Sequence, residues 1–201
     1  MNKVISIGNQ GFDKIRENDY FYVDKTGFIK EWWESGDDVT LITRPRRFGK
    51  TLNMDMLKCF FSNQYTGRAD LFEGLSIWKE EKYRELQGQY PVIFVSFADV
   101  KERDYESAVR KIKHILVDLY LQYEFLKKNF SESEQMRYRQ ISYNMDNVAA
   151  QDALKSLAAL LSSYYGKKAI ILLDEYDTPM QEAYIHGYWE EFTGFMRSLF
   201  N

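Results

Sequence analysis

The chain has 201 residues, of which 45% are hydrophobic and 28% are charged, a balance typical of a folded globular protein. Its formal net charge of −3 argues against a global basic field for nucleic acid, and its single cysteine, Cys59, excludes an internal disulfide framework and a cysteine-based zinc site. No stretch approaches the ~20 apolar residues of a membrane span, and the apolar run at the start is too short for a secretory signal, so the sequence predicts a cytoplasmic protein.

Residues 1–38 are predicted to form an N-terminal cover segment that precedes the main domain at 39–201. The aromatic and β-branched run 20–23 favours a strand or an extended edge. A helix is expected to follow, with Asp24 or Thr26 as its N-cap and an apolar stripe along one side.

A strand, a loop and a helix are predicted in that order from residue 39 onward. The run 39–43 is apolar and β-branched, which indicates a buried strand. Residues 44–49 have the composition of a turn, and apolar side chains at helical spacing extend from Leu52 to Phe60.

Two more apolar runs, 92–97 and 169–173, predict strands covered on both faces. Helices are predicted between and after them: one capped by Asp104, one opened by a capping box of Ser131 and Glu134, one over 148–165 that ends at Gly166, and one over 188–200. This alternation predicts an α/β fold with a mostly parallel sheet and helices on both faces. The last helix has an apolar face with nothing beyond the sheet to cover it, and two further strands of such a sheet are not visible. We therefore expect the domain to be incomplete at its C-terminus, as a fragment of a longer protein.

The loop before the first long helix has the pattern of a phosphate-binding loop. Gly49-Lys50-Thr51 matches the end of Gly-x-x-x-x-Gly-Lys-Ser/Thr, with Arg44 in the position of the first glycine. Backbone N–H groups of such a loop point at phosphate oxygens, Lys50 would reach the β- and γ-phosphates, and the Thr51 hydroxyl would hold Mg²⁺. The expected nucleotide contacts are Arg46, Arg47, Phe48, Gly49, Lys50, Thr51 and Leu52. The alternative is a chance Gly-Lys-Thr at a helix start, since the first glycine is missing.

The strand predicted over 169–173 ends in two adjacent carboxylates, Asp174 and Glu175. Such a strand would deliver Asp174 to the Mg²⁺ that Thr51 contacts, and Glu175 to the water that attacks the phosphate. Adjacent Asp and Glu at this point are typical of P-loop proteins that use a glutamate for hydrolysis. The alternative is a pair of solvated acids, with Asp174 or Asp177 capping the next helix.

The loop arginines and the single cysteine each allow two interpretations. Arg44, Arg46 and Arg47 either bind phosphate, acidic groups of a partner or a nucleic-acid backbone, or they pair with surface carboxylates. Cys59 lies in an apolar run, which favours a buried thiol over a reactive one.

Three blocks of the sequence resemble the AAA-ATPase-like family of bacterial P-loop proteins, which is related to the signal-transducing NTPases with numerous domains. They are Tyr22-Val23-Asp24-Lys25-Thr26, the stretch from Leu41 to Leu52, and Leu173-Asp174-Glu175-Tyr176-Asp177. The resemblance implies an ATP-binding domain with a glutamate-type hydrolytic site and with the first block near the adenine. Many similar proteins carry a C-terminal PD-(D/E)XK nuclease-type domain. In P-loop folds of this branch, the phosphate-loop strand and the Asp-Glu strand are separated in the sheet by a strand from later in the sequence.

The main hypothesis is a Mg-ATP-binding ATPase in which Lys50 and Glu175 are catalytic, and Thr51 and Asp174 hold the metal. The alternatives are a nucleotide-dependent binding switch with little hydrolysis, and the ATPase part of a nuclease-associated system. The expected cofactors are ATP and Mg²⁺. The expected partners are ATP or ADP and a protein partner or a C-terminal nuclease-type domain. No membrane partner is expected, and the acidic net charge does not support nucleic-acid binding by this domain alone.

Overall fold

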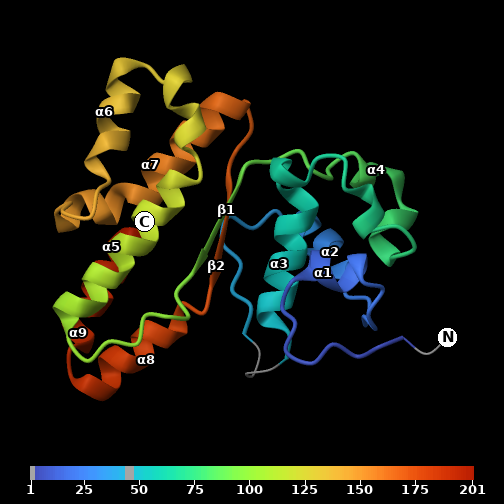
Figure 1. The fold of residues 1–201 in the computed structure, drawn as a ribbon, viewed down its shortest axis with the longest axis horizontal. Coiled ribbons are helices and arrows are strands. Elements are labelled where there is room, and N and C mark those ends of the chain that lie inside the picture. Colours follow the sequence, from blue (N-terminus) through green and yellow to red (C-terminus); the bar gives the residue numbers. More distant parts are fainter. Residues whose placement is uncertain (1–2, 44–47) are drawn as a thin grey trace. The chain divides into compact units, whose positions relative to one another are not determined.

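A computed structural model describes residues 3–43 and 48–201, which form two compact units, Met1–Val92 and Ile93–Asn201 (Figure 1). Helices predominate in both units. Within the described ranges, none of them combines the length and the apolar character that crossing a bilayer requires. Each unit has its own buried core and is described by itself.

The first unit is built from short helices around α3. Its α-helices are α1 (Phe12–Glu17), α2 (Gly27–Ser35), α3 (Lys50–Phe61) and α4 (Glu81–Arg84), and its 3₁₀ helices are η1 (Asn63–Tyr65), η2 (Ala69–Leu71) and η3 (Ser76–Lys79). α1 packs on α3, and α2 packs on η3. α2 and α3 are predicted by apolar spacing, whereas no sequence pattern predicted α1 or α4.

Aromatic rings fill the core of the first unit. Phe12 of α1 stacks on Phe72, with 5.1 Å between the ring centroids, and Phe60 of α3 meets Phe72 edge-on at 5.0 Å. Phe61 of α3 stacks on Trp33 of α2 at 5.4 Å. Each buried ring removes ~150–250 Å² of surface from water. These contacts therefore hold α1 and α2 against α3.

The second unit combines a two-stranded parallel sheet with a bundle of helices. Its strands are β1 (Val92–Ser96), which begins at the boundary between the units, and β2 (Ile170–Asp174). Its helices are α5 (Tyr105–Leu121), the 3₁₀ helix η4 (Glu124–Asn129), α6 (Glu132–Gln140), α7 (Asn147–Tyr165), α8 (Asp177–His186) and α9 (Trp189–Leu199). α7 packs on α9, and α5 packs on both.

Helix ends in the second unit follow the predicted local signals. Asp104 Oδ1 accepts a hydrogen bond of 2.8 Å from Ser107 N at the start of α5. Ser131 and Glu134 form the predicted capping box of α6. Gly166 ends α7 in the left-handed conformation, with φ of 66°. Each prediction is confirmed, because these signals act through hydrogen bonds or backbone freedom within a few residues.

The strand predicted at 39–43 is wrong for the described structure. The run forms no strand, and Val39 and Leu41 are 87% and 62% exposed. An extended run becomes a strand only when a neighbour pairs its N–H and C=O groups, and no such neighbour lies among the described residues. The sequence predicts a mostly parallel sheet with helices on both faces. Among the described residues, the sheet consists of β1 and β2, and helices dominate the α/β structure.

Two smaller predictions are also corrected. Thr26 stands at the N-cap of α2 but makes no capping hydrogen bond, because its hydroxyl donates to Asp24. The apolar face of α9 is covered rather than left without a partner. Phe192, Phe195 and Met196 are buried in the core that α9 shares with α5 and α7.

Candidate functional site

The chain enters α3 through a residue whose backbone favours glycine. Gly49 is the N-cap of α3, with φ of 76° and ψ of 27° in the left-handed region. A side chain with a Cβ is strained in this conformation, whereas glycine adopts it freely. The Gly49 carbonyl accepts a hydrogen bond of 3.0 Å from Asn53 N, so the helix begins directly after the turn.

The start of α3 is suited to binding an anion. The first N–H groups of an α-helix have no partner within the helix, and the helix dipole adds positive potential at this end. Gly49 has no side chain that could cap these groups, so the N-cap supplies no acceptor that competes with a phosphate. Lys50 and Thr51 occupy the first turn of the helix, and both are partly buried.

The other predicted contacts of the loop are placed only in part. Phe48 is 60% exposed, and Leu52 is partly buried in the first turn of α3. Arg44, Arg46 and Arg47 lie outside the described residues, so the roles expected of them stay predictions.

The segment before α2 is anchored to both α3 and η3. Asp24 Oδ1 accepts hydrogen bonds from Thr26 N at 2.9 Å and from Thr26 Oγ1 at 2.6 Å, and Asp24 Oδ2 accepts one from Ser76 N at 2.7 Å. Tyr22 OH donates to Met56 Sδ on α3 at 3.4 Å. This segment includes the first of the three sequence blocks, and the side-chain contacts fix it beside the helix that carries Lys50.

Two pKa shifts match the hydrogen bonds of this segment. Burial raises the pKa of Tyr22 to about 12, so its hydroxyl stays protonated and can donate at neutral pH. Burial would also raise the pKa of Asp24, but the hydrogen bonds from Thr26 and Ser76 outweigh it and hold that pKa below its usual range. Asp24 is therefore an acceptor on both oxygens over the physiological pH range.

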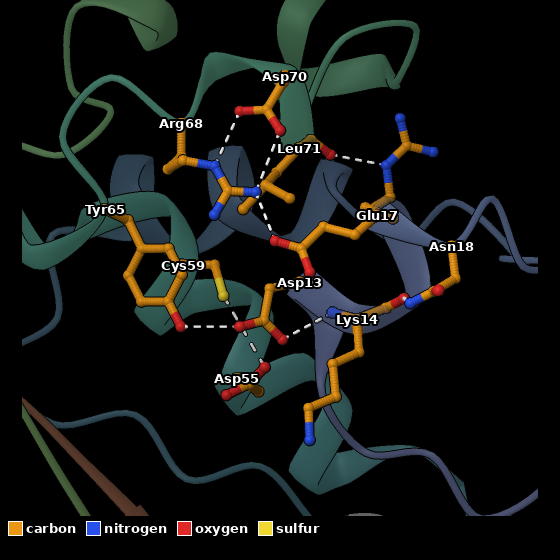
Figure 2. Close-up of polar contacts among 11 residues, drawn as sticks. Asp13, Lys14, Glu17, Asn18, Asp55, Cys59, Tyr65, Arg68, Asp70 and Leu71 are labelled. Atoms are coloured by element: carbon orange, nitrogen blue, oxygen red, sulfur yellow. Dashed lines mark hydrogen bonds and ion pairs between the residues drawn. The ribbon is translucent and has the colours of Figure 1, made fainter.

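A buried carboxylate on α3 fixes α1 in place. Asp55 is 8% exposed, and its Oδ2 accepts a hydrogen bond of 2.7 Å from Phe12 N, the first residue of α1. Asp55 Oδ1 pairs with Lys58 Nζ. Alongside, Tyr65 OH donates to Asp13 Oδ2 at 3.1 Å (Figure 2). No sequence signal predicted this anchor, because Asp55 and Phe12 are 43 residues apart.

Cys59 lies beside this anchor as a buried thiol. It is fully buried, and its Sγ donates to Asp55 Oδ2 at 3.8 Å (Figure 2). Burial raises the pKa of Cys59 to about 12, and the negative charge of Asp55 acts in the same direction. Only the thiolate is a strong nucleophile, so the interpretation as a buried, unreactive thiol is the one that the structure supports.

The acidic pair lies where β2 ends. Asp174 is the last residue of β2 and is 5% exposed, and its carbonyl accepts a hydrogen bond of 3.0 Å from Phe97 N. Glu175 follows with φ of 53°, and it and Asp19 are the described non-glycine residues with positive φ. The Glu175 carboxylate accepts a hydrogen bond of 3.2 Å from Thr178 Oγ1 in the first turn of α8. The strand thus presents one buried carboxylate and one on a strained turn.

The alternative in which Asp174 or Asp177 caps the next helix is wrong. The N-cap of α8 is Tyr176, and no side chain makes a capping hydrogen bond there. Asp177 is the first residue of α8. Its negative charge interacts favourably with the positive end of the helix dipole, but its side chain makes no capping hydrogen bond. Pro179 is buried in the first turn of α8, where its missing N–H leaves no hydrogen bond of the helix unmade.

A hollow of about 580 Å³ runs along α8 and the start of α9. It is lined by Asp177, Met180, Gln181, Tyr184, Ile185 and Trp189. The lining is mainly apolar and includes no lysine or arginine, so its chemistry does not suit a triphosphate. Positive potential of the kind that an anion requires is found instead at the start of α3, from the backbone N–H groups and Lys50.

Comparison with known proteins shows that the chain belongs to one family. The sequence model of the family described as "Predicted AAA-ATPase" matches residues 6–201. A curated protein of Azotobacter chroococcum mcd 1, described as "Uncharacterized protein in vnfD 5'region", is 31% identical over 179 residues, which are 89% of this chain and 30% of that protein. The chain thus spans about a third of the length of this relative. No solved structure gives a significant match.

Proposed function

Because the chain belongs to the AAA-ATPase-like family, we propose that it is a P-loop domain that binds Mg-ATP and hydrolyses it with the help of a glutamate. The observation that carries the proposal is the start of α3. There, Gly49 in the left-handed conformation leads directly into a first turn that contains Lys50 and Thr51. A phosphate loop ends in this way, with glycine, lysine and threonine at the start of a helix.

The residues of the first unit bind the phosphates. The backbone N–H groups at the start of α3 donate to phosphate oxygens, and the Lys50 ammonium contacts the β- and γ-phosphates. Arg46, Arg47 and Phe48 complete the loop around the nucleotide, as the sequence pattern predicts.

The proposed Mg²⁺ ligands are the Thr51 hydroxyl and the Asp174 carboxylate. Both are hard oxygen ligands, which Mg²⁺ prefers, and the near-complete burial of Asp174 suits a group that serves a cation rather than solvent. Among the described residues, no group of three or more His, Cys, Asp and Glu side chains could hold a metal. The two proposed ligands would leave the other coordination positions of the ion to phosphates and water. When bound, Mg²⁺ neutralises charge on the β- and γ-phosphates.

Glu175 receives the proton of the attacking water. The water oxygen bonds to the γ-phosphorus, the bond from that phosphorus to the bridging β-phosphate oxygen breaks, and ADP and inorganic phosphate leave. Glu175 Oε2 accepts from Thr178, whereas Oε1 accepts no hydrogen bond from the described residues and can take the proton. The left-handed backbone of Glu175 supports this role, because such strain in a residue with a side chain concentrates at functional sites.

Calorimetric titration of Mg-ATP and Mg-ADP into the protein tests the binding site. We expect a dissociation constant on the order of micromolar for the wild type, and a loss of at least about tenfold in Lys50→Ala. Absence of binding by the wild-type protein, or unchanged binding by Lys50→Ala, would contradict the site.

Phosphate release tests the hydrolytic role. Glu175→Gln keeps the shape of the side chain but cannot take a proton, so we expect nucleotide binding to persist while turnover falls about 100-fold or more. Unchanged turnover in this variant would refute the assignment of Glu175. Binding without turnover in the wild type would favour the nucleotide-dependent switch instead.

A further inference from the structure

A second lysine lies beside the phosphate loop. A methyl group built on Gly49 would lie 3.6 Å from Lys25 Nζ, so the ammonium of Lys25 approaches the N-cap of α3. Lys25 is 24 residues before Gly49 in the sequence, and its side chain is partly buried. The motif of the loop gave no reason to expect a cation from outside the loop, so far back in the sequence, at this point.

The position of this ammonium is electrostatically unfavourable without an anion. The N-terminal end of a helix is the positive end of its dipole, and it stabilises negative rather than positive groups. No carboxylate of the described residues forms an ion pair with Lys25. Its neighbour Asp24 uses both oxygens to accept hydrogen bonds from Thr26 and Ser76. A bound phosphate would relieve the repulsion between the Lys25 ammonium and the start of α3.

The backbone around Lys25 is held at both sides. Lys25 N donates a hydrogen bond of 3.4 Å to Tyr22 OH, which itself donates to Met56 Sδ on α3. The next residue, Thr26, is fully buried, and its Oγ1 accepts from Ile77 N at 3.2 Å. These contacts keep the base of the Lys25 side chain at a fixed place relative to α3. The energetic cost of ordering a long lysine side chain is therefore reduced before any ligand binds.

We propose that Lys25 is a second phosphate-binding lysine, which contacts the nucleotide polyphosphate from the Gly49 side of the loop and acts together with Lys50. The inference rests on the proposed nucleotide site and assigns the block around Lys25 to the phosphates. An ammonium donates up to three charged hydrogen bonds, so its contribution grows with the number of phosphates on the ligand.

The test compares Lys25→Met with Lys14→Met. Methionine keeps an unbranched side chain of similar length and removes the charge. Lys14 is an exposed lysine on α1 of the same unit, so its variant changes the net charge equally without approaching the loop. Fluorescent ATP, ADP and AMP analogues are titrated with Mg²⁺ into each protein, and inorganic tripolyphosphate is titrated as a competitor.

We expect Lys25→Met to bind the ATP analogue about tenfold or more weakly, the ADP analogue less affected and the AMP analogue unchanged. Tripolyphosphate should compete correspondingly less well. Lys25→Arg should recover part of the affinity, and Lys14→Met should match the wild type. Without ligand, Lys25→Met should unfold at the same temperature as the wild type or higher, because a cation is removed from the positive end of α3. A structural role would lower that temperature instead.

Three results would overturn the inference. If Lys25→Met bound the ATP analogue with wild-type affinity while Lys50→Ala lost binding, the nucleotide site would be supported but Lys25 would not belong to it. An equal loss for the ATP, ADP and AMP analogues would assign Lys25 to the nucleoside rather than to the phosphates. If the wild-type protein bound neither nucleotide nor tripolyphosphate, the proposed function and this inference would both fall.

Discussion

The anchor between α1 and α3 gives the sharpest prediction for stability, through the variant Asp55→Ala. The change removes the acceptor of Phe12 N, and a buried N–H left without a partner costs about 1–3 kcal/mol. It also removes one partner of Lys58, whose side chain is 26% exposed, which adds no more than about 1 kcal/mol. We therefore expect the free energy of unfolding to fall by about 1–4 kcal/mol.

Urea unfolding followed by tryptophan fluorescence measures this change. Trp32, Trp33 and Trp78 belong to the first unit, and the fourth tryptophan, Trp189, to the second, so the signal reports mainly the unit that contains the anchor. Asp55→Asn should lose less, about 1–2 kcal/mol, because the amide oxygen can still accept from the backbone N–H.

The matched control is Asp70→Ala in the same unit. The Asp70 side chain is 59% exposed and pairs with Arg68 at 3.0 Å, so its removal should change stability by no more than about 0.5 kcal/mol. If Asp55→Ala and Asp70→Ala lowered stability equally, the reasoning that the buried carboxylate holds α1 on α3 would be refuted.

Three further outcomes are expected. Native Cys59 should react with iodoacetamide at pH 8 about a thousandfold more slowly than the unfolded chain, since burial raises its pKa to about 12; equal rates would contradict its burial. Glu175→Gly should be about 1 kcal/mol more stable than Glu175→Ala, because both variants lose the carboxylate but only alanine keeps a Cβ at positive φ. Thermal unfolding of the two variants measures this difference, and equal stability would contradict the strain at this position. The pKa of Asp24 is lowered in the folded state, so its stabilisation is present above the unfolded pKa of about 3.9 and is lost as the pH falls through the folded value. Unfolding free energies at pH 6 and pH 3 should differ less in Asp24→Asn than in the wild type, and an equal pH dependence would contradict this.

Local signals in the sequence were sufficient for several elements. Asp104, the pair of Ser131 and Glu134, and Gly166 mark helix ends whose hydrogen bonds lie within one turn, so no knowledge of the fold was needed. The left-handed backbone of Gly49 likewise needs no distant partner, because glycine adopts this conformation freely.

Elements that depend on distant partners could not be predicted in this way. The run 39–43 has the composition of a strand, yet pairing requires a neighbour that composition does not specify. The apolar face of α9 looked unpartnered in the sequence because its partners, α5 and α7, are recognised only after the chain has folded. Arg46 and Arg47 lie outside the described residues, and their roles remain predictions.

By itself, the sequence determined the family, the helix that carries Lys50 and Thr51, and the strand that ends at Asp174. Motif spacing and apolar periodicity encode these features along a single segment of chain. Only the tertiary structure decided that Asp55 anchors α1 and that Lys25 lies beside Gly49. Both depend on side chains that are far apart in sequence and are brought together by the burial of the aromatic core of the first unit.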